Sequence, residues 1–406
     1  MCLSIIILPN IGFGQDTTRA RKNLNYLAGK KLMGRGYLLK GDQKAADFIR
    51  NEFIESGLKP LSGSYLQPFS ISQNQFPKTP LLKINGRNVE AGGEFIPLPA
   101  CPSVSGCFRL VQLDSTALQT KLNVKNGVRE DEAWAIPGRL KKWLFNQPSF
   151  ATQRPQVLVW LESKLTHSLA EESEKMPAIA LKNKILQPAD SILELKITSK
   201  IYPNIKTQNV IGLLKGTLYP DSFLILCAHY DHLGSLGKQL YFPGANDNAS
   251  GTSMLLEMAS YFSKHPSKYS VLLIAFSGEE AGLLGSQYFV KHSPIPLSNI
   301  KFVFNMDLMG FGENGATVVN ATLHPEQFKR LTEINTTHHY LPELKSRGKA
   351  ANSDHYYFSE AGVPAFFIYT LGGLGYYHDV NDRPETVTFI KFTETFNLIT
   401  HFIEGF

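Results

Sequence analysis

The chain has 406 residues, of which 43% are hydrophobic and 19% are charged, a composition typical of a globular protein with a substantial core. Its net charge of +6, from 41 Lys and Arg against 35 Asp and Glu, is small for this length, and no basic run is present, so nucleic acid is not expected as a partner. No apolar stretch reaches the roughly 18 residues that a membrane-spanning helix needs.

Residues 1–14, "MCLSIIILPNIGFG", are apolar and end in small residues before a polar, helix-like stretch. This pattern is typical of the hydrophobic region and cleavage site of a secretory signal, although a charged start is missing. We therefore expect a protein exported to the periplasm or secreted; the alternative is a buried N-terminal strand. Residues 15–80 follow, with helical periodicity over 43–58 and Gly57 as its stop.

Residues 81–203 have a different sequence pattern. They contain short runs of alternating apolar and polar residues, such as "QVLVWLES" and "ILELKIT", separated by Gly and Pro. They predict an inserted β-rich domain. Cys101 and Cys107 flank "PSVSG" within it, and in an exported protein they can close a small disulfide loop or remain free.

Residues 204–406 alternate strand and helix signals and, with 15–80, form the larger predicted domain. Apolar runs at 223–228, 269–276, 300–307 and 363–370 predict strands, and amphipathic stretches at 250–265, 280–292, 325–337 and 388–403 predict helices, the first with Ser250 as N-cap. The pattern predicts an α/β fold of three layers, a mixed and mostly parallel sheet flanked by helices. Ligands in such folds bind beyond the carboxyl ends of the strands.

Five short motifs in this region carry metal-binding chemistry. They are His229 and Asp231 in "CAHYDHLG", Asp247 in "GANDNASG", Glu279 and Glu280 in "FSGEEAGLLGS", Asp307 in "FNMDLMG", and His378 in "YYHDVNDRPET". Two imidazoles, three ligand carboxylates and one further acid are what two zinc-like ions and a general base require. Any one motif alone would be weak, but each falls at a predicted strand end or helix start.

The residue types suggest individual roles. His229 can offer one ring nitrogen to a metal, while Asp231 accepts the other ring N–H and fixes the tautomer. Asp247 can bridge two ions with its two oxygens, although taken alone it is more typical of a helix cap. Asp307 follows a buried strand with no other charge nearby, so a cation is its simplest partner.

Glu279 and Glu280 are adjacent acids at a predicted strand-to-helix turn. One can ligate a metal while the other takes a proton from water; the alternative is two solvated acids favoured by a helix dipole. Tyr377, beside His378, can donate a hydrogen bond to a developing oxyanion. The remaining histidines are interpreted as structural.

At these motifs the chain resembles the M28 family of co-catalytic zinc peptidases, and more narrowly its secreted bacterial aminopeptidases. The segments "LNYLAGKKLMGRGYLLKGDQKAADFIRNEFIESGLKPLSGSYLQPF" and "SDHYYFSEAGVPAFFI" extend the resemblance over the chain outside the insert. The insert resembles a divergent protease-associated domain.

The resemblance implies two Zn²⁺ ions and peptide substrates with a free N-terminus. Carried over by motif position, one ion takes His229 and Asp307, the other takes Glu280 and His378, Asp247 bridges, Glu279 is the base and Asp231 supports His229. Alternatives are a glutaminyl-cyclase-like acyltransferase with a single zinc, or a non-catalytic binding paralogue.

Asp379 departs from the family pattern, which usually has a small hydroxyl residue or a similar one after this histidine. We expect Asp379 either to face the cleft and repel acidic substrate side chains, or to be a surface acid.

Overall fold

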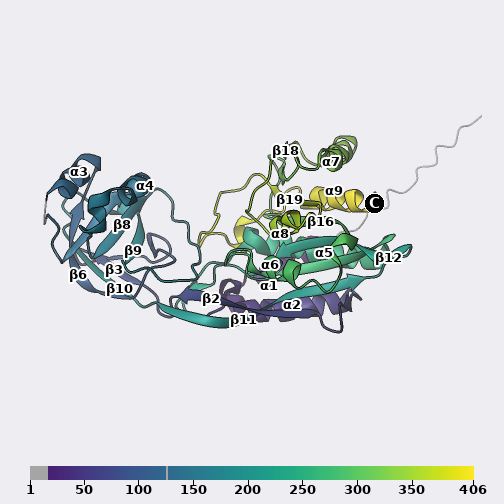
Figure 1. Cartoon of the computed structure of the whole chain (residues 1–406), viewed down its shortest axis with the longest axis horizontal. Helices are drawn as coiled ribbons and strands as arrows, with labels where there is room; N and C mark the ends of the chain where they lie inside the picture. Colours follow the sequence, from purple (N-terminus) through teal and green to yellow (C-terminus); the bar gives the residue numbers. More distant parts are fainter. Residues whose placement is uncertain (1–16, 125–126) are drawn as a thin grey trace, which may run out of the picture.

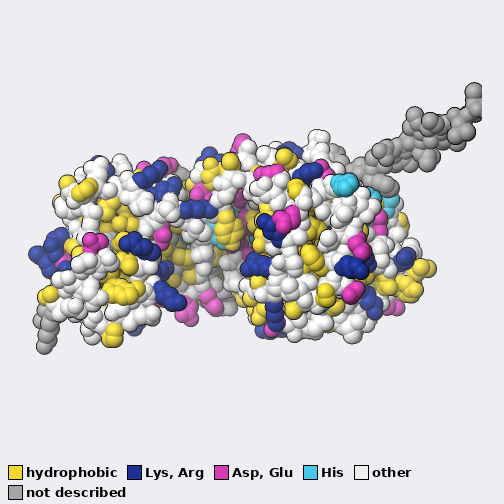
Figure 2. Space-filling model, turned by 90° about the horizontal axis from the view of Figure 1, so that it is seen from above, with side chains coloured by type: hydrophobic (Ala, Val, Ile, Leu, Met, Phe, Trp, Pro, Cys, Tyr) yellow, Lys and Arg dark blue, Asp and Glu magenta, His cyan; other side chains and the backbone are white. Residues whose placement is uncertain are grey.

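The computed structural model describes residues 17–124 and 127–406, so the predicted signal segment and Cys2 lie outside the described residues. Two sheets lie at opposite ends of an elongated molecule (Figure 1). Charged side chains of both signs are scattered over the face seen in Figure 2, in keeping with the small net charge. No helix among the described residues is long and apolar enough to span a membrane.

The larger sheet has nine strands and carries the predicted metal-binding motifs. In spatial order eight of them are β1 (Lys59–Pro60), β11 (Lys200–Leu214), β15 (Tyr269–Phe276), β12 (Tyr219–His229), β16 (Ile300–Asp307), β19 (Ala365–Thr370), β17 (Ala316–Val319) and β18 (Leu344–Ser346), and β2 (Leu66–Gln75) pairs with β11. The central strands β15, β12, β16 and β19 are parallel, whereas β11 and β17 join them antiparallel. The predicted mixed sheet is confirmed, with parallel pairing among the four central strands and again between β17 and β18 at one edge.

Helices cover both faces of this sheet because its central strands are apolar on both sides. Along β12, Leu224 and Leu226 belong to one core cluster, and Ile225 and Cys227 belong to the other. The first core is covered by α1 (Thr17–Leu27), α2 (Gly41–Glu55), α5 (Gly251–Lys264), α7 (Pro325–His338) and α9 (Phe392–Glu404). The second is covered by α6 (Leu284–Lys291) and α8 (His355–Glu360). The three-layer α/β prediction is therefore confirmed.

Two predicted helix starts are wrong in detail. Ser250 does not cap α5; its hydroxyl donates to the main-chain O of Asn246 at 2.6 Å, and Asn248 Oδ1 instead accepts from Gly251 N at 2.8 Å. Helix α6 begins only at Leu284, because Gly278 (φ 74°) and Gly282 (φ 107°) hold the preceding residues in a turn. The two adjacent glutamates thus lie on a turn rather than at a helix start.

The second sheet has eight strands, all from the predicted insert. In spatial order they are β4 (Arg87–Val89), β3 (Leu81–Ile84), β10 (Ile192–Ile197), β6 (Val104–Gln112), β7 (Glu132–Pro137), β8 (Val157–Glu162), β9 (Ala178–Lys182) and β5 (Phe95–Pro97). Strands β6 to β9 are parallel, and α3 (Ser115–Asn123) and α4 (Lys141–Phe145) contribute to a core on one side of them. The expectation of a β-rich segment missed these helices, one of which is capped by Asp114 through Ala117 N.

The two cysteines of the insert are not joined. Cys101 is a buried free thiol, and Cys107, on β6, is an exposed one, so the alternative of two free thiols holds. The other alternative, a disulfide between Cys101 and Cys107, is wrong.

The two domains are joined by a long ribbon and by a shared core. Strands β2 and β11 pair antiparallel from Leu66 opposite Val210 to Gln75 opposite Lys200. The core beneath the second sheet also includes side chains from the catalytic region, namely Leu233, Leu236, Phe242 and Val380. The hairpin of β13 (Ser235–Leu236) and β14 (Leu240–Tyr241) therefore packs against the insert.

Candidate metal centre

The five motifs meet at the carboxyl edge of the parallel strands. His229 is the last residue of β12 and Asp307 the last of β16. Glu279 and Glu280 follow β15, Asp247 precedes α5, and His378 lies on the loop after β19. Residues that are far apart in the sequence thus converge because parallel strands end at the same edge.

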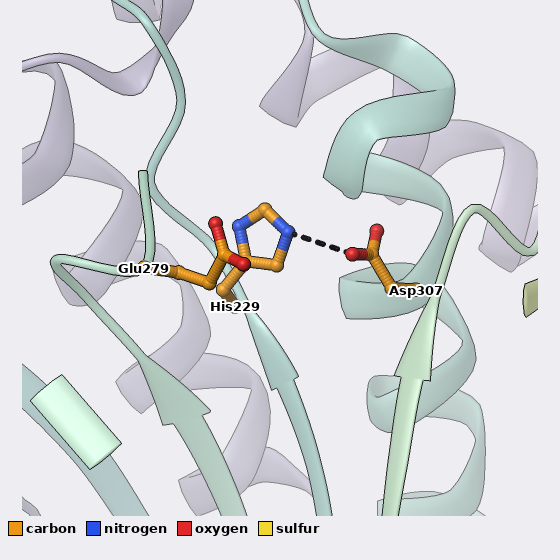
Figure 3. Close-up of side chains that lie close together, drawn as sticks. All are labelled: His229, Glu279 and Asp307. Atoms are coloured by element: carbon orange, nitrogen blue, oxygen red, sulfur yellow. Dashed lines mark ion pairs between the residues drawn. The ribbon is translucent and has the colours of Figure 1, made fainter. Parts of the chain in front are cut away.

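His229 and Asp307 form one side of the site. His229 Nε2 lies 3.3 Å from Asp307 Oδ2 and 3.4 Å from Asp247 Oδ1. Figure 3 shows the Glu279 carboxylate beside the same imidazole, and ligand atoms of His229, Glu279 and Asp307 lie within 4.8 Å of one another. By distance alone, Glu279 can be a ligand or a neighbour of the ligands.

His378 and Glu280 form the other side. His378 Nε2 lies 3.1 Å from Asp247 Oδ2 and 3.2 Å from Glu280 Oε2. Asp247 therefore directs one oxygen to each imidazole, as a bridging carboxylate does. It makes no helix-capping hydrogen bond in this position.

Unpaired buried atoms in this cluster fit a metal. Among the described residues, His229 Nε2, Asp247 Oδ2 and Asp307 Oδ1 are buried without a hydrogen-bond partner. Buried polar atoms are costly unless paired, and imidazole nitrogen with carboxylate oxygen is a donor set that zinc accepts. The residues present therefore fit zinc ions.

The electrostatics of the site also favour bound cations. Burial raises the pKa of the Glu279 carboxyl well above its usual range. Burial alone would lower the pKa of His378, but the charges of Glu280 and Asp247 raise it to about 11. The first shift comes mainly from burial and the second from neighbouring carboxylates, and positive charge would stabilise the ionised carboxylates in both places.

Comparison with known proteins identifies this region. Residues 209–403, which hold all five motifs, match peptidase family M28. This part of the chain is hereafter called the M28 domain, after the family model that it matches.

Two curated relatives match part of the chain. Aminopeptidase YwaD of Bacillus subtilis is 30% identical over 246 residues, which are 58% of this chain and 52% of YwaD. A probable zinc metalloprotease of Pyrenophora teres f. teres is 32% identical over 162 residues, 39% of this chain and 33% of that protein. The chain thus spans about half the length of the first relative and a third of the second.

The fold of the whole chain has a solved counterpart. BSAP, a zinc aminopeptidase from Bacillus subtilis, is similar with a TM-score of 0.71 and 20% identity, over 97% of this chain and 95% of that one. The likeness is one of fold, and because it covers nearly the whole chain it includes the second sheet.

Asp231 supports the M28 domain site differently from the sequence expectation. His229 Nδ1 pairs with the main-chain O of Asp231 at 3.2 Å, while the carboxylate is 3.8 Å away. That carboxylate instead accepts hydrogen bonds from Glu279 N at 3.2 Å, Glu280 N at 3.3 Å and the Tyr37 hydroxyl at 2.8 Å. Asp231 therefore fixes the tautomer of His229 through its backbone and the glutamate turn through its side chain.

Arg35 and Asp382 are functional residues that sequence reasoning missed. Arg35 is fully buried and donates to the main-chain O atoms of Tyr230 and Gly244, both at 2.7 Å. Asp382 accepts from Asn246 N at 2.8 Å and Asp247 N at 3.0 Å. Both hold the loops that carry ligands, and their roles depend on contacts distant in sequence.

His232 was missed as well. Its Nδ1 lies 2.7 Å from Glu280 Oε1, its Nε2 is buried without a partner among the described residues, and burial lowers its pKa. His232, Asp247 and Glu280 offer atoms within 4.8 Å of one another. The available signal was its spacing in "HYDH", three residues after His229 and just beyond the end of β12.

Tyr377 and Asp379 flank His378 but face different surroundings. The Tyr377 ring stacks on His378, with ring centroids 3.8 Å apart, and is 49% exposed. Asp379 Oδ1 accepts from Asn381 N and Asn381 Nδ2, both at 2.8 Å. The carboxylate of Asp379 is therefore engaged in its own turn.

A side pocket of about 220 Å³ adjoins the metal-binding residues. Its lining includes Asp247 and Tyr377 together with the apolar residues Leu308, Phe311 and Leu371. Asp382 also lines it, whereas Asp379 does not. The pocket thus combines apolar side chains with the carboxylates of Asp247 and Asp382.

Proposed function

We propose that this chain is a co-catalytic di-zinc aminopeptidase that hydrolyses the N-terminal peptide bond of peptides. The observation that carries the proposal is the position of Asp247 between the two imidazoles, at 3.4 Å from His229 and 3.1 Å from His378. Each imidazole has a further carboxylate beside it, Asp307 on one side and Glu280 on the other. Two ions bridged by one carboxylate account for all five side chains.

In this proposal His229 and Asp307 would hold one ion, Glu280 and His378 would hold the other, and Asp247 would offer one oxygen to each. Zinc there supplies Lewis-acid polarisation of the scissile carbonyl and makes water more acidic. The protein itself orients the proposed ligands, because Arg35, Asp231 and Asp382 hold the loops that carry them by hydrogen bonds.

Glu279 is the proposed general base. Its carboxylate takes a proton from water, the hydroxide adds to the carbonyl carbon, and the proton passes to the amide nitrogen as the C–N bond breaks. The free amine leaves and Glu279 is again ionised. The Asp231 carboxylate, which accepts Glu279 N, holds this glutamate at the turn.

The aminopeptidase assignment draws on the pocket and on the relatives. A pocket of about 220 Å³ is the size of a single side chain site rather than an extended groove. YwaD and BSAP are both named as aminopeptidases. Tyr377, which lines this pocket and stacks on His378, is the proposed hydrogen-bond donor to the developing oxyanion.

The test is a pair of substrates that differ only at the amine. Leucine nitroanilide should be hydrolysed by zinc-loaded protein and N-acetyl-leucine nitroanilide should not, because an aminopeptidase needs the free α-amino group. Chelator should abolish the first activity and added zinc should restore it. Cleavage of acetylated peptides at internal bonds would instead indicate an endopeptidase.

A further inference from the structure

His167 of the inserted domain contacts a residue of the candidate metal centre. His167 lies between β8 and β9 of the second sheet. Its main-chain O is 2.8 Å from His378 Nδ1, and its main-chain N donates to the main-chain O of His378 at 3.1 Å. A predicted ligand of the M28 domain is thus held on both its ring and its backbone by the other domain.

The segment that makes these contacts is itself anchored. The His167 ring is 2% exposed and stacks on Phe242 with centroids 4.6 Å apart and an interplanar angle of 10°. Nearby, Lys164 Nζ donates to Gly375 O at 2.6 Å. The loop that carries His378 is therefore tied to the insert at two points.

His378 needs such support. It has a left-handed backbone (φ 56°), which an L-residue adopts only when its surroundings impose it. Its loop contains Gly372, Gly373 and Gly375, all with positive φ, so the loop backbone upstream of His378 has few side chains to pack. Val380, just beyond, packs into the core of the second sheet.

The hydrogen bond at His378 Nδ1 also determines which ring nitrogen of His378 is available to bind a metal ion. When a carbonyl accepts Nδ1–H, the imidazole is fixed in the tautomer whose Nε2 carries the lone pair. In His378 that Nε2 faces Asp247 and Glu280. The insert thus aims the ring at the position where the second ion would bind.

We infer that segment 164–167 of the inserted domain is a positioning element for His378, so that tight binding of the second ion depends on the insert. This inference rests on the proposed two-ion function. His167 acts through its backbone, and its side chain serves to hold that backbone in place.

The experiment compares zinc binding to metal-free protein at buffered free-zinc concentrations, with bound zinc measured by elemental analysis. His167→Ala removes the stack on Phe242 and should weaken one of two sites by roughly 10- to 100-fold, the range for partners that orient a ligand. His167→Phe is the matched control, since it keeps an aromatic ring at the stack and removes a buried Nδ1 that has no hydrogen-bond partner. It should bind both ions like the wild type.

Lys164→Ala provides a surface variant in case His167→Ala does not fold. It removes one hydrogen bond to Gly375 O and should weaken the same site by roughly 2- to 10-fold. Lys184→Ala, an exposed change elsewhere in the insert, should leave both sites unchanged. In a Glu280→Gln background, which lacks the weakened site, His167→Ala should have no further effect.

Two ions bound with wild-type affinity in both His167→Ala and Lys164→Ala would overturn the inference. Loss of an ion in His167→Phe would also overturn it, because it would make the imidazole itself the active group. If wild-type protein binds fewer than two ions, the proposed function fails instead, so the two failures are distinguishable.

Discussion

Asp231 explains at the level of single residues why two adjacent glutamates can have different roles. Its carboxylate accepts the main-chain N–H groups of both Glu279 and Glu280, which fixes the turn between them. From this turn Glu280 reaches His232 and His378, while Glu279 lies beside His229 and Asp307. One backbone geometry thus sends one acid to each side of the site.

Substitution of each glutamate separates base from ligand. Glu279→Gln should keep two ions and lower kcat by roughly 100- to 10,000-fold, since it removes the proton acceptor. Glu280→Gln should lose metal instead, because an amide is a weaker ligand than a carboxylate. Zinc content and kcat measured on both variants show which glutamate is the base and which is the ligand. If Glu279→Gln loses an ion, Glu279 is a ligand with His229 and Asp307.

The sequence analysis identified the ligand candidates that lie in local motifs. It did not identify the residues that position those motifs through hydrogen bonds to main-chain groups. His229, Asp247, Glu280, Asp307 and His378 were expected together, and the structure brings them together. Arg35, Asp382 and His167 act through main-chain groups of residues far along the chain. No local spacing reports such contacts, so only the fold can place them.

At the level of structural elements, the Arg35 guanidinium holds the loop after β12 and the loop before α5 in place. Arg35 ends a 3₁₀ segment (Lys30–Arg35) near the start of the chain and donates to carbonyls after β12 and before α5. Burial lowers the pKa of Arg35 to about 10, which leaves it charged at neutral pH. The N-terminal segment therefore stabilises the ligand loops directly.

Removal of the Arg35 guanidinium should lower the stability of the folded protein. Arg35→Met leaves several buried carbonyl groups without donors and should lower the free energy of unfolding by about 3 kcal/mol or more. Arg50→Met, on the surface of α2 where it pairs with the exposed Asp47, should change it by less than about 0.5 kcal/mol. Urea unfolding followed by circular dichroism measures both. Equal effects would mean that Arg35 does not hold the loops.

The side pocket predicts which N-terminal side chains are accepted. Leu308, Phe311 and Leu371 offer apolar contact, and Asp247 and Asp382 repel a second carboxylate. Leucine nitroanilide should exceed glutamate nitroanilide in kcat/KM by roughly 10- to 100-fold, the range for burial of one apolar side chain.

Asp379→Asn is the control for this preference. Because the Asp379 carboxylate is bonded to Asn381 and does not line the pocket, the substitution should leave the Glu/Lys ratio of kcat/KM within tenfold of the wild-type ratio. A larger shift would place Asp379 in the substrate site after all.

Long apolar runs were predictable as elements, and short or edge elements were not. The four central strands match the apolar runs because burial on both faces leaves little room for polar residues. Strands β17 and β18 and helices α3 and α4 are short, and their place in the fold depends on neighbours rather than on a strong local period. Helix α5 lacks its expected cap because Ser250 is recruited to the Asn246 carbonyl and to Met309 N.

At the scale of the whole molecule, the two domains share a core and a ligand loop. The β2–β11 ribbon joins them, Val380 and Phe242 pack beneath the second sheet, and His167 contacts His378. The insert thus contacts the candidate metal centre, and a change inside the insert is expected to affect that site through segment 164–167.

The central claim is that one site holds two ions, and zinc stoichiometry tests it most directly. Metal-free protein should regain aminopeptidase activity as zinc is added and should contain two ions per chain when activity is full, as measured by elemental analysis on the same samples. A glutaminyl-cyclase-like enzyme would be complete with one. Full activity with one ion, or with none, would contradict the account.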